Sequence, residues 1–251
     1  MEPSELKNGK GLRVKACSGD DVQKWIISSS GQIVNKKDSN FCLSRRKARP
    51  NLQLGRCSSV KKALSTFAYD WFDSSIVLLS TKEVISIPLD DTLSQIFMYE
   101  RDSQGSDDNQ KWTLVKTDNS EVSSIPAKVT IRSGSDSKCL QPEKASLGKA
   151  LKVESCTDKK LQKWNSDNYG QLHSQKDGTL CIKKSKKVLV LGECASASSR
   201  GTSFIYNYWD RTILWAGNPN KKAVTVMPQG TVKVRKKKLG MITQIWNFEN
   251  A

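Results

Sequence analysis

DDVQKW (20–25), DDNQKW (107–112), KLQKW (160–164) and TQIW (243–246) are four versions of one motif, in which a glutamine stands two positions before a tryptophan. The motif marks an internal repeat. When the chain is shifted by about 137 residues it falls on itself, so that GQIVNKKDSNFCL aligns with GQLHSQKDGTLCI and FAYDWF with FIYNYW. The sequence is therefore a tandem duplication, and we place the two halves at 1–120 and 121–251, with a polar boundary from Lys116 to Pro126.

Each half contains a shorter period of about 40 residues that ends on an aromatic residue. The units end at Trp25, Phe67 and Trp112 in the first half and at Trp164, Phe204 and Trp246 in the second. Short runs of alternating apolar residues, such as KVTIRSG (128–134), lie between clusters of Gly, Asp, Asn and Ser, which is typical of strands and turns. Three units of about four short strands predict all-β domains that close on themselves and so remove exposed sheet edges.

The charge of the chain predicts an acidic partner. Its 251 residues include 41 Lys and Arg against 25 Asp and Glu, a formal net charge of +16. Nucleic acid, an anionic membrane and a sulfated or otherwise acidic glycan are the candidate partners. No apolar run approaches the ~20 residues of a membrane-spanning helix, so we expect no transmembrane segment. The chain begins without the apolar stretch of a signal peptide.

Catalytic and metal motifs are absent from the sequence. The single histidine, His173, has no nucleophile motif beside it, and the chain has no P-loop, no GxGxxG and no CxxC. We therefore expect no enzyme, no cofactor and no metal, with His173 a structural or surface residue.

A Cys-Leu strand, a second cysteine about 15 residues later and a closing Gln-x-Trp, repeated through both halves, resemble the ricin B-type (R-type) lectin family. The resemblance covers nearly the whole chain. It implies two tandem β-trefoils, the first without its initial strand, and carbohydrate binding. It also implies that the six closing aromatic residues, Trp25, Phe67, Trp112, Trp164, Phe204 and Trp246, fill the core and do not contact ligand.

The resemblance further implies three disulfides: Cys42–Cys57, Cys139–Cys156 and Cys181–Cys194. On sequence alone six cysteines allow fifteen pairings. Such bonds imply an oxidising compartment and a secreted protein. Cys17 is left unpaired. Because MEPSELKNGKGLRVKAC aligns with LQPEKASLGKALKVESC, the equivalent of Cys139 would precede Met1, and we expect the chain to begin within a repeat. A tolerated free thiol is the alternative.

In the R-type lectins an active unit has an acid two residues after the first cysteine position, a stacking aromatic residue and an Asn-Gln pair. Here the acid positions hold Glu2, Ser44, Ser86, Gln141, Lys183 and Thr225, and the stacking positions hold Lys15, Gly55, Tyr99, Glu154, Gly192 and Arg235. The third unit of the first half is thus the candidate neutral-sugar site, formed by Ser86, Tyr99, Asn109 and Gln110, with Asp90 or Asp91 replacing the acid. Alternatively, Tyr99 is an ordinary strand residue and the Asp pair a solvated turn.

Basic clusters stand where trefoil sites would open, at RRKAR (45–49), KKSKK (183–187) and KVRKKK (233–238). Because Arg and Lys bind sulfate and phosphate by charge-assisted hydrogen bonds, they predict a preference for anionic or sulfated glycans. The cysteine-rich trefoils of the mannose receptor family are similar in this respect. The candidate anion-binding residues are Arg45, Arg46, Lys183, Lys184, Lys186, Arg235 and Lys236. A solvated loop is the alternative for each cluster.

Three classes of function therefore compete. The first is a lectin or glycan-binding module, whose partners are glycans or glycoproteins. The second, a nucleic-acid-binding protein, is disfavoured because the chain lacks RRM, KH and zinc-finger signatures. The third is an extracellular interaction domain without a sugar ligand, or the targeting module of a larger toxin, enzyme or receptor, which the loss of Asp from all six acid positions favours.

Overall fold

The computed structural model describes residues 1–251 except residue 48 and residues 89–94, 103–106, 117–125 and 195–200. The described chain consists of short β-strands and single-turn 3-10 helices, without an α-helix. Within this part of the chain, no helix has the length and apolar character needed to cross a bilayer. The prediction of an all-β protein is confirmed. Most of the predicted boundary segment, Lys116 to Pro126, lies outside the described residues.

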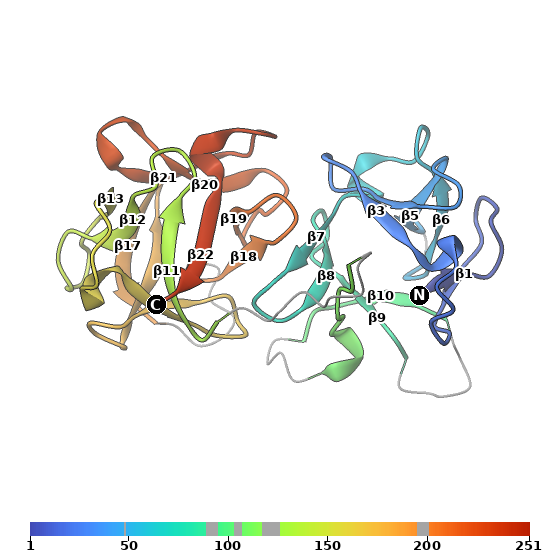
Figure 1. Ribbon diagram of the computed structural model, residues 1–251, viewed down its shortest axis with the longest axis horizontal. Helices are drawn as coiled ribbons and strands as arrows, with labels where there is room; N and C mark the ends of the chain where they lie inside the picture. Colours follow the sequence, from blue (N-terminus) through green and yellow to red (C-terminus); the bar gives the residue numbers. More distant parts are fainter. Residues whose placement is uncertain (48, 89–94, 103–106, 117–125, 195–200) are drawn as a thin grey trace. The chain divides into compact units, whose positions relative to one another are not determined.

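The chain folds into two compact units, the first blue to green and the second yellow-green to red in Figure 1. The first includes Met1–Tyr69 and Ser74–Asp102 and extends to Thr113. The second includes Asp70–Asp73 and Leu114–Ala251.

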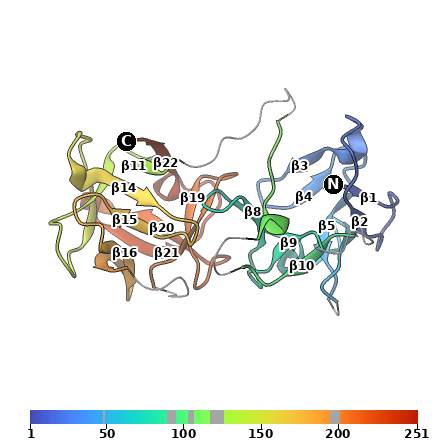
Figure 2. The ribbon, with the colours of Figure 1, turned by 90° about the horizontal axis from the view of Figure 1, so that it is seen from below.

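The second unit is a closed set of antiparallel strands. Its strands are β11 (Lys128–Ser133), β12 (Cys139–Pro142), β13 (Leu151–Glu154), β14 (Lys163–Ser166), β15 (Leu172–Ser174), β16 (Leu180–Ser185), β17 (Val188–Glu193), β18 (Phe204–Asn207), β19 (Thr212–Trp215), β20 (Lys222–Val226), β21 (Val232–Lys236) and β22 (Trp246–Asn250). Its 3-10 helices are η4 (Lys160–Gln162), η5 (Pro228–Gly230) and η6 (Ile242–Gln244). Strands β14 to β17 pair in sequence, as do β18 to β21, and β11 joins β14 to β22 (Figure 2).

Alternation along the strands places one apolar row inside the second unit. Leu189 and Leu191 of β17 and Val232 and Val234 of β21 lie in the core, all at most 3% exposed. The residues between them point to the opposite face, because successive side chains of a strand alternate. Burying each of these side chains stabilises the fold by about 1.5–3 kcal/mol.

The first unit is built from the same kind of short antiparallel strands. Its strands are β1 (Glu2–Pro3), β2 (Leu12–Arg13), β3 (Trp25–Ile27), β4 (Ile33–Asn35), β5 (Phe41–Arg45), β6 (Leu52–Arg56), β7 (Phe67–Asp70), β8 (Ser75–Leu78), β9 (Val84–Ser86) and β10 (Phe97–Tyr99). Its 3-10 helices are η1 (Asp21–Gln23), η2 (Lys62–Leu64) and η3 (Asp108–Gln110). Strands β3 to β6 form one antiparallel sheet, β7 to β10 follow one another, and β1 pairs with β2.

Every copy of Gln-x-Trp folds in the same way. A 3-10 turn ends on the glutamine, and the indole N–H of the tryptophan donates to the backbone carbonyl just before the acid position. These bonds join Trp25 to Met1 (3.2 Å), Trp112 to Ile85 (2.8 Å), Trp164 to Leu140 (3.1 Å) and Trp246 to Val224 (3.1 Å). The motif therefore recurs because it ties the end of each unit to the strand that carries the acid position.

The closing aromatic residues differ in burial. Four are at most 1% exposed: Phe67, Trp164, Phe204 and Trp246. Trp25 and Trp112 are only half-buried, which corrects the expectation that all six fill the core. In the second unit β11 pairs with both tryptophan-bearing strands, at Val129↔Trp164 and Ser133↔Trp246. Among the described strands, β3 pairs with β4 alone, so Trp25 is not covered in this way.

Two equivalent glycines have a backbone that favours Gly. Gly31 and Gly170 have φ of +81° and +71°. Each carbonyl accepts a hydrogen bond from the N–H of the next closing aromatic residue, Phe67 at 2.8 Å and Phe204 at 2.9 Å. A Cβ on Gly170 would lie 2.0 Å from the carbonyl oxygen of Phe204. The GQ pair that aligns the halves is thus fixed by backbone geometry.

The cysteines do not all pair. Cys139–Cys156 and Cys181–Cys194 are disulfides, with S–S distances of 2.02 and 2.08 Å. Cys17, Cys42 and Cys57 are free thiols, so the expected Cys42–Cys57 bond is absent from this structure. Burial and a hydrogen bond with Cys57 raise the pKa of Cys42 far above its ordinary value.

Candidate glycan-binding surfaces

In each 40-residue repeat, the acid position lies on one strand of a hairpin. The stacking position lies on the other strand, two residues beyond the residue that pairs with the acid position. Gln141 pairs with Lys152 and Thr225 with Lys233, so Glu154 and Arg235 follow two residues later on the same side. The register thus brings the two predicted positions of a unit together. What each unit can bind depends on which side chains occupy them.

In three of the 40-residue repeats, the motif glutamine donates a hydrogen bond to the side chain at the acid position. Its Nε2 donates to Glu2 Oε2 from Gln23 (3.0 Å), to Gln141 Oε1 from Gln162 (2.8 Å) and to Thr225 Oγ1 from Gln244 (3.0 Å). A hydrogen-bonding group that is already satisfied gains little from a ligand hydroxyl. These three positions are therefore parts of the fold's own hydrogen-bond network.

Glu2 is the one carboxylate at an acid position, and its oxygens are already engaged by two cations and by the motif glutamine. Arg13 donates from Nε at 3.1 Å and Lys15 Nζ lies 3.5 Å away, in addition to the bond from Gln23. The bond from Gln23 and the two cations lower the pKa of Glu2. Lys15 is itself the residue at the stacking position, so this unit has an internal ion pair where a sugar would bind.

The third unit of the first half retains an exposed aromatic ring. Tyr99 is 45% exposed on β10, with its ring 6.1 Å from that of Phe97, whereas Ser86 on the neighbouring β9 is buried. Gln110 is buried and donates to the carbonyl of Glu100 (3.1 Å), the residue after Tyr99. The predicted residues Asp90 and Asp91 lie outside the described residues.

Asn109 supports the same unit from the other side. Its Nδ2 donates to the carbonyl of Ile87 at 3.0 Å, next to Ser86. Its buried Oδ1 has no hydrogen-bond partner among the residues that the structure describes. A buried acceptor without a partner is uncommon in proteins.

Two of the predicted anion-binding residues are engaged elsewhere. Arg45 forms a bidentate ion pair with Glu83, in which Nη2 donates to Oε1 at 2.8 Å. Lys184 places its Nζ 4.2 Å from the centroid of the Trp215 ring. The prediction that both side chains are free to bind an anion is therefore corrected. A cation paired with a carboxylate, or placed over an aromatic ring, is already partly neutralised.

The remaining predicted cations are exposed: Arg46, Lys183, Lys186, Arg235 and Lys236. None forms an ion pair with a carboxylate in the described part of the chain. The stem of Lys183 lies over Gly192, where a Cβ would come within 2.4 Å of the lysine Cδ. In this unit a lysine therefore covers the stacking position, and no flat ring is available to a sugar.

Two basic clusters that are distant in sequence meet on one sheet. Val188 pairs with Lys233, and the N–H of Val234 donates to the carbonyl of Lys187 at 2.8 Å. The outward residues of β16 and β21, together with the hairpin between β16 and β17, form a surface that we call the basic face: Lys183, Lys186, Lys187, Lys233 and Arg235. Lys187 and Lys233 lie in the predicted basic clusters but were not among the candidate residues, since only the β17–β21 pairing shows that the two clusters adjoin.

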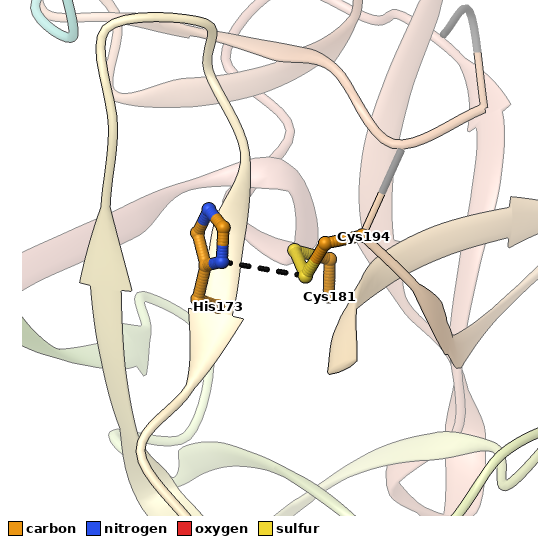
Figure 3. A group of neighbouring side chains, drawn as sticks. All are labelled: His173, Cys181 and Cys194. Carbon is orange, nitrogen blue, oxygen red and sulfur yellow. Dashed lines mark hydrogen bonds between the residues drawn. A yellow bond between two sulfur atoms is a disulfide. The ribbon is translucent and has the colours of Figure 1, made fainter. Parts of the chain in front are cut away.

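His173 lies beside the Cys181–Cys194 disulfide (Figure 3). Its Nε2 is 2.9 Å from Asp167 Oδ2, and its Nδ1 is 3.3 Å from Sγ of Cys194 and 3.4 Å from the carbonyl of Gly178. The hydrogen bond with Asp167 raises the pKa of His173. His173, Cys181 and Cys194 are close enough to ligate a metal. However, a disulfide offers no thiolate.

The sequence of the chain matches a family that accounts for this fold. The model of the ricin-type β-trefoil lectin domain matches residues 2–121 and again 127–250. The chain therefore belongs to the ricin-type β-trefoil lectin family, as the repeat pattern predicted.

Solved structures similar to this chain share little sequence with it. They include the agglutinin of Abrus precatorius (16% identity, TM-score 0.42, 98% of this chain and 89% of that one). Another is a non-toxic homologue of type II RIPs from Momordica charantia in complex with α-methyl-D-galactoside (14%, 0.45, 98% and 90%). A third is the C-half of the earthworm R-type lectin in complex with GalNAc (16%, 0.44, 50% and 100%). No curated protein sequence matches the chain.

Proposed function

We propose that this protein is an extracellular glycan-binding protein or module that takes anionic, in particular sulfated, glycans on the basic face of its second unit. One observation carries the proposal: cations from two of the 40-residue repeats within this unit converge where the family's acid position has become Lys183, and none of them is ion-paired within the described chain. The two disulfides favour an oxidising compartment.

The chemistry of this unit suits an anion better than a neutral sugar. A carboxylate at the acid position accepts hydrogen bonds from sugar hydroxyls, whereas Lys183 can only donate. Sugar rings stack on aromatic side chains, whereas the lysine stem covers Gly192. Sulfate groups accept charge-assisted hydrogen bonds from Lys and Arg. Lys233 and Arg235 present such donors on β21, which pairs with β17, the partner strand of β16.

A sulfated-glycan array with matched desulfated controls tests the proposal. We expect binding to sulfated glycans that weakens with salt, because exposed charges are screened. The triple variant Lys183→Gln, Lys233→Gln, Arg235→Gln should lose most of it. The charge-matched control Lys144→Gln, Lys159→Gln, Lys160→Gln changes exposed lysines elsewhere in the same unit and should retain it. Equal losses in both variants would contradict a defined site.

The unit that contains Tyr99 is a second candidate, for a neutral sugar, because it alone keeps an exposed aromatic ring and the Asn109–Gln110 pair. Weak galactose binding that is lost in Tyr99→Ala would support it, and parent protein that binds no galactose would exclude it.

The alternative is an interaction domain without a sugar ligand, or the targeting module of a larger toxin, enzyme or receptor. The internal hydrogen bonds at three acid positions favour it. A blank array at low salt would establish this reading in place of the first.

A further inference from the structure

The last Gln-x-Trp turn of the chain exposes apolar side chains. Leu239 is 60% and Ile242 is 55% exposed, and Met241 between them is partly exposed. Gly240 has φ of +69°, and a Cβ built on it would meet no atom within 4 Å, so the loop stands away from neighbouring segments. We call residues 239–242 the apolar tip.

The fold does not require this apolar tip. The same 3-10 turn occurs before Trp25, Trp112 and Trp164, and its first residue there is Asp21, Asp108 or Lys160. All three are exposed and charged. In the fourth turn, η6, the equivalent residue is Ile242. The turn therefore forms with a charged first residue, and its folding does not explain the apolar residue in this copy.

Lysines lie at the base of the loop that carries the apolar tip. Lys222 pairs with Lys236 across β20 and β21, and the N–H of Lys237 donates to the carbonyl of Lys221 at 2.8 Å. Lys221, Lys236 and Lys238 are exposed, and none has a carboxylate partner among the described residues.

The base of the loop is held in place by two contacts. The N–H of Lys238 donates to Gln244 Oε1 at 2.8 Å, and Nζ of Lys237 lies 2.6 Å from Asp210. The apolar tip and its lysines are therefore presented on a fixed base.

We propose that the apolar tip and its lysines dock on an anionic lipid bilayer. The apolar side chains enter the interface between headgroups and acyl chains, and the lysines contact lipid phosphate and carboxylate groups. Apolar side chains flanked by Lys are the composition that binds such interfaces. Charge complementarity selects this occupant, because a second copy of the chain would bring its own lysines against these. The proposal does not depend on the glycan site.

Co-sedimentation of the full chain with phosphatidylcholine vesicles, with and without phosphatidylserine, tests the proposal. We expect binding only to the vesicles with phosphatidylserine. The double variant Leu239→Ser, Ile242→Ser should bind them at least about tenfold more weakly, because it removes the inserted side chains. The variant Lys221→Gln, Lys236→Gln, Lys238→Gln should also bind more weakly, and high salt should reduce parental binding.

A matched control uses Leu147→Ser, Ile26→Ser, the same two changes at side chains that are 60% and 51% exposed elsewhere. This control should bind vesicles as the parent does. The Leu239→Ser, Ile242→Ser protein should still bind heparin, a sulfated glycan, which separates this site from the basic face. The proposal would be overturned if the parent protein does not bind the vesicles. It would also be overturned if the Leu239→Ser, Ile242→Ser variant binds them as the parent does. Sedimentation velocity that shows a dimer broken by these two changes would overturn it too, since the face would then join two copies.

Discussion

Gln244 donates from Nε2 to Oγ1 of Thr225 at 3.0 Å, and the same nitrogen reaches the carbonyl of Lys236 at 2.8 Å. Its Oε1 accepts from the N–H of Lys238 at 2.8 Å. The amide of one motif glutamine thus satisfies the acid position, the end of β21 and the start of the next loop. In this unit the place of a sugar ligand is occupied by a structural hydrogen-bond hub.

Replacing this hub should destabilise the second unit. Gln244 is 1% exposed, and Gln244→Ala removes one buried and two partly buried hydrogen bonds, which should cost about 1–3 kcal/mol. Urea denaturation followed by tryptophan fluorescence measures the loss. The exposed Gln95→Ala serves as control and should leave the midpoint unchanged. An unchanged midpoint for Gln244→Ala would mean that water replaces the amide without loss.

The two tryptophans that close the first unit of each half should differ in their contribution to stability. Trp164 is fully buried, and Trp164→Ala should lower the free energy of unfolding by about 3–5 kcal/mol. Trp25 is half-buried, so Trp25→Ala should cost clearly less. Denaturant titration of both variants provides the comparison. Equal losses would show that Trp25 is covered in solution.

Cys42 and Cys57 should cross-link under oxidation. Cys42 pairs with Gly55 as Cys181 pairs with Gly192, and each partner strand continues to the second cysteine, Cys57 or Cys194. The equivalent backbone therefore suits a disulfide. A thiol-disulfide buffer at raised pH should remove two hydrogens from the intact mass, because only the thiolate reacts.

Peptide mapping should place the new bond at Cys42–Cys57, and Cys57→Ser should abolish it. A bond that involves Cys17 instead would contradict the prediction.

The ion pair of His173 should make the second unit slightly less stable as pH rises. Its pKa is raised in the folded state, so the stabilisation is complete below the unfolded pKa of about 6.5 and is lost as pH rises through the folded pKa. Since the pair is partly exposed, we expect at most about 1 kcal/mol. Denaturation between acidic and mildly alkaline pH measures it. Asp167→Asn should flatten this dependence, and a variant that keeps the parental slope would assign the effect to another group.

The fold could be predicted from the sequence because local patterns that repeat along the chain specify it. A glutamine and tryptophan at fixed spacing form the same 3-10 turn and the same indole bond in four places, and each needs only neighbouring strands. The disulfides Cys139–Cys156 and Cys181–Cys194 lie within single hairpins, where the resemblance put them. Such contacts join residues of one hairpin or of neighbouring strands.

The site depended on contacts between distant residues, which sequence patterns do not carry. Arg45 belongs to a basic run, yet a glutamate 38 positions away, Glu83, neutralises it. Lys187 and Lys233 come from different 40-residue repeats of the second half and adjoin only because β17 pairs with β21. The sequence by itself determined a duplicated β-trefoil and its positive charge. The tertiary structure alone decided which charges remain unpaired and where they gather, because ion pairing and burial depend on three-dimensional neighbours.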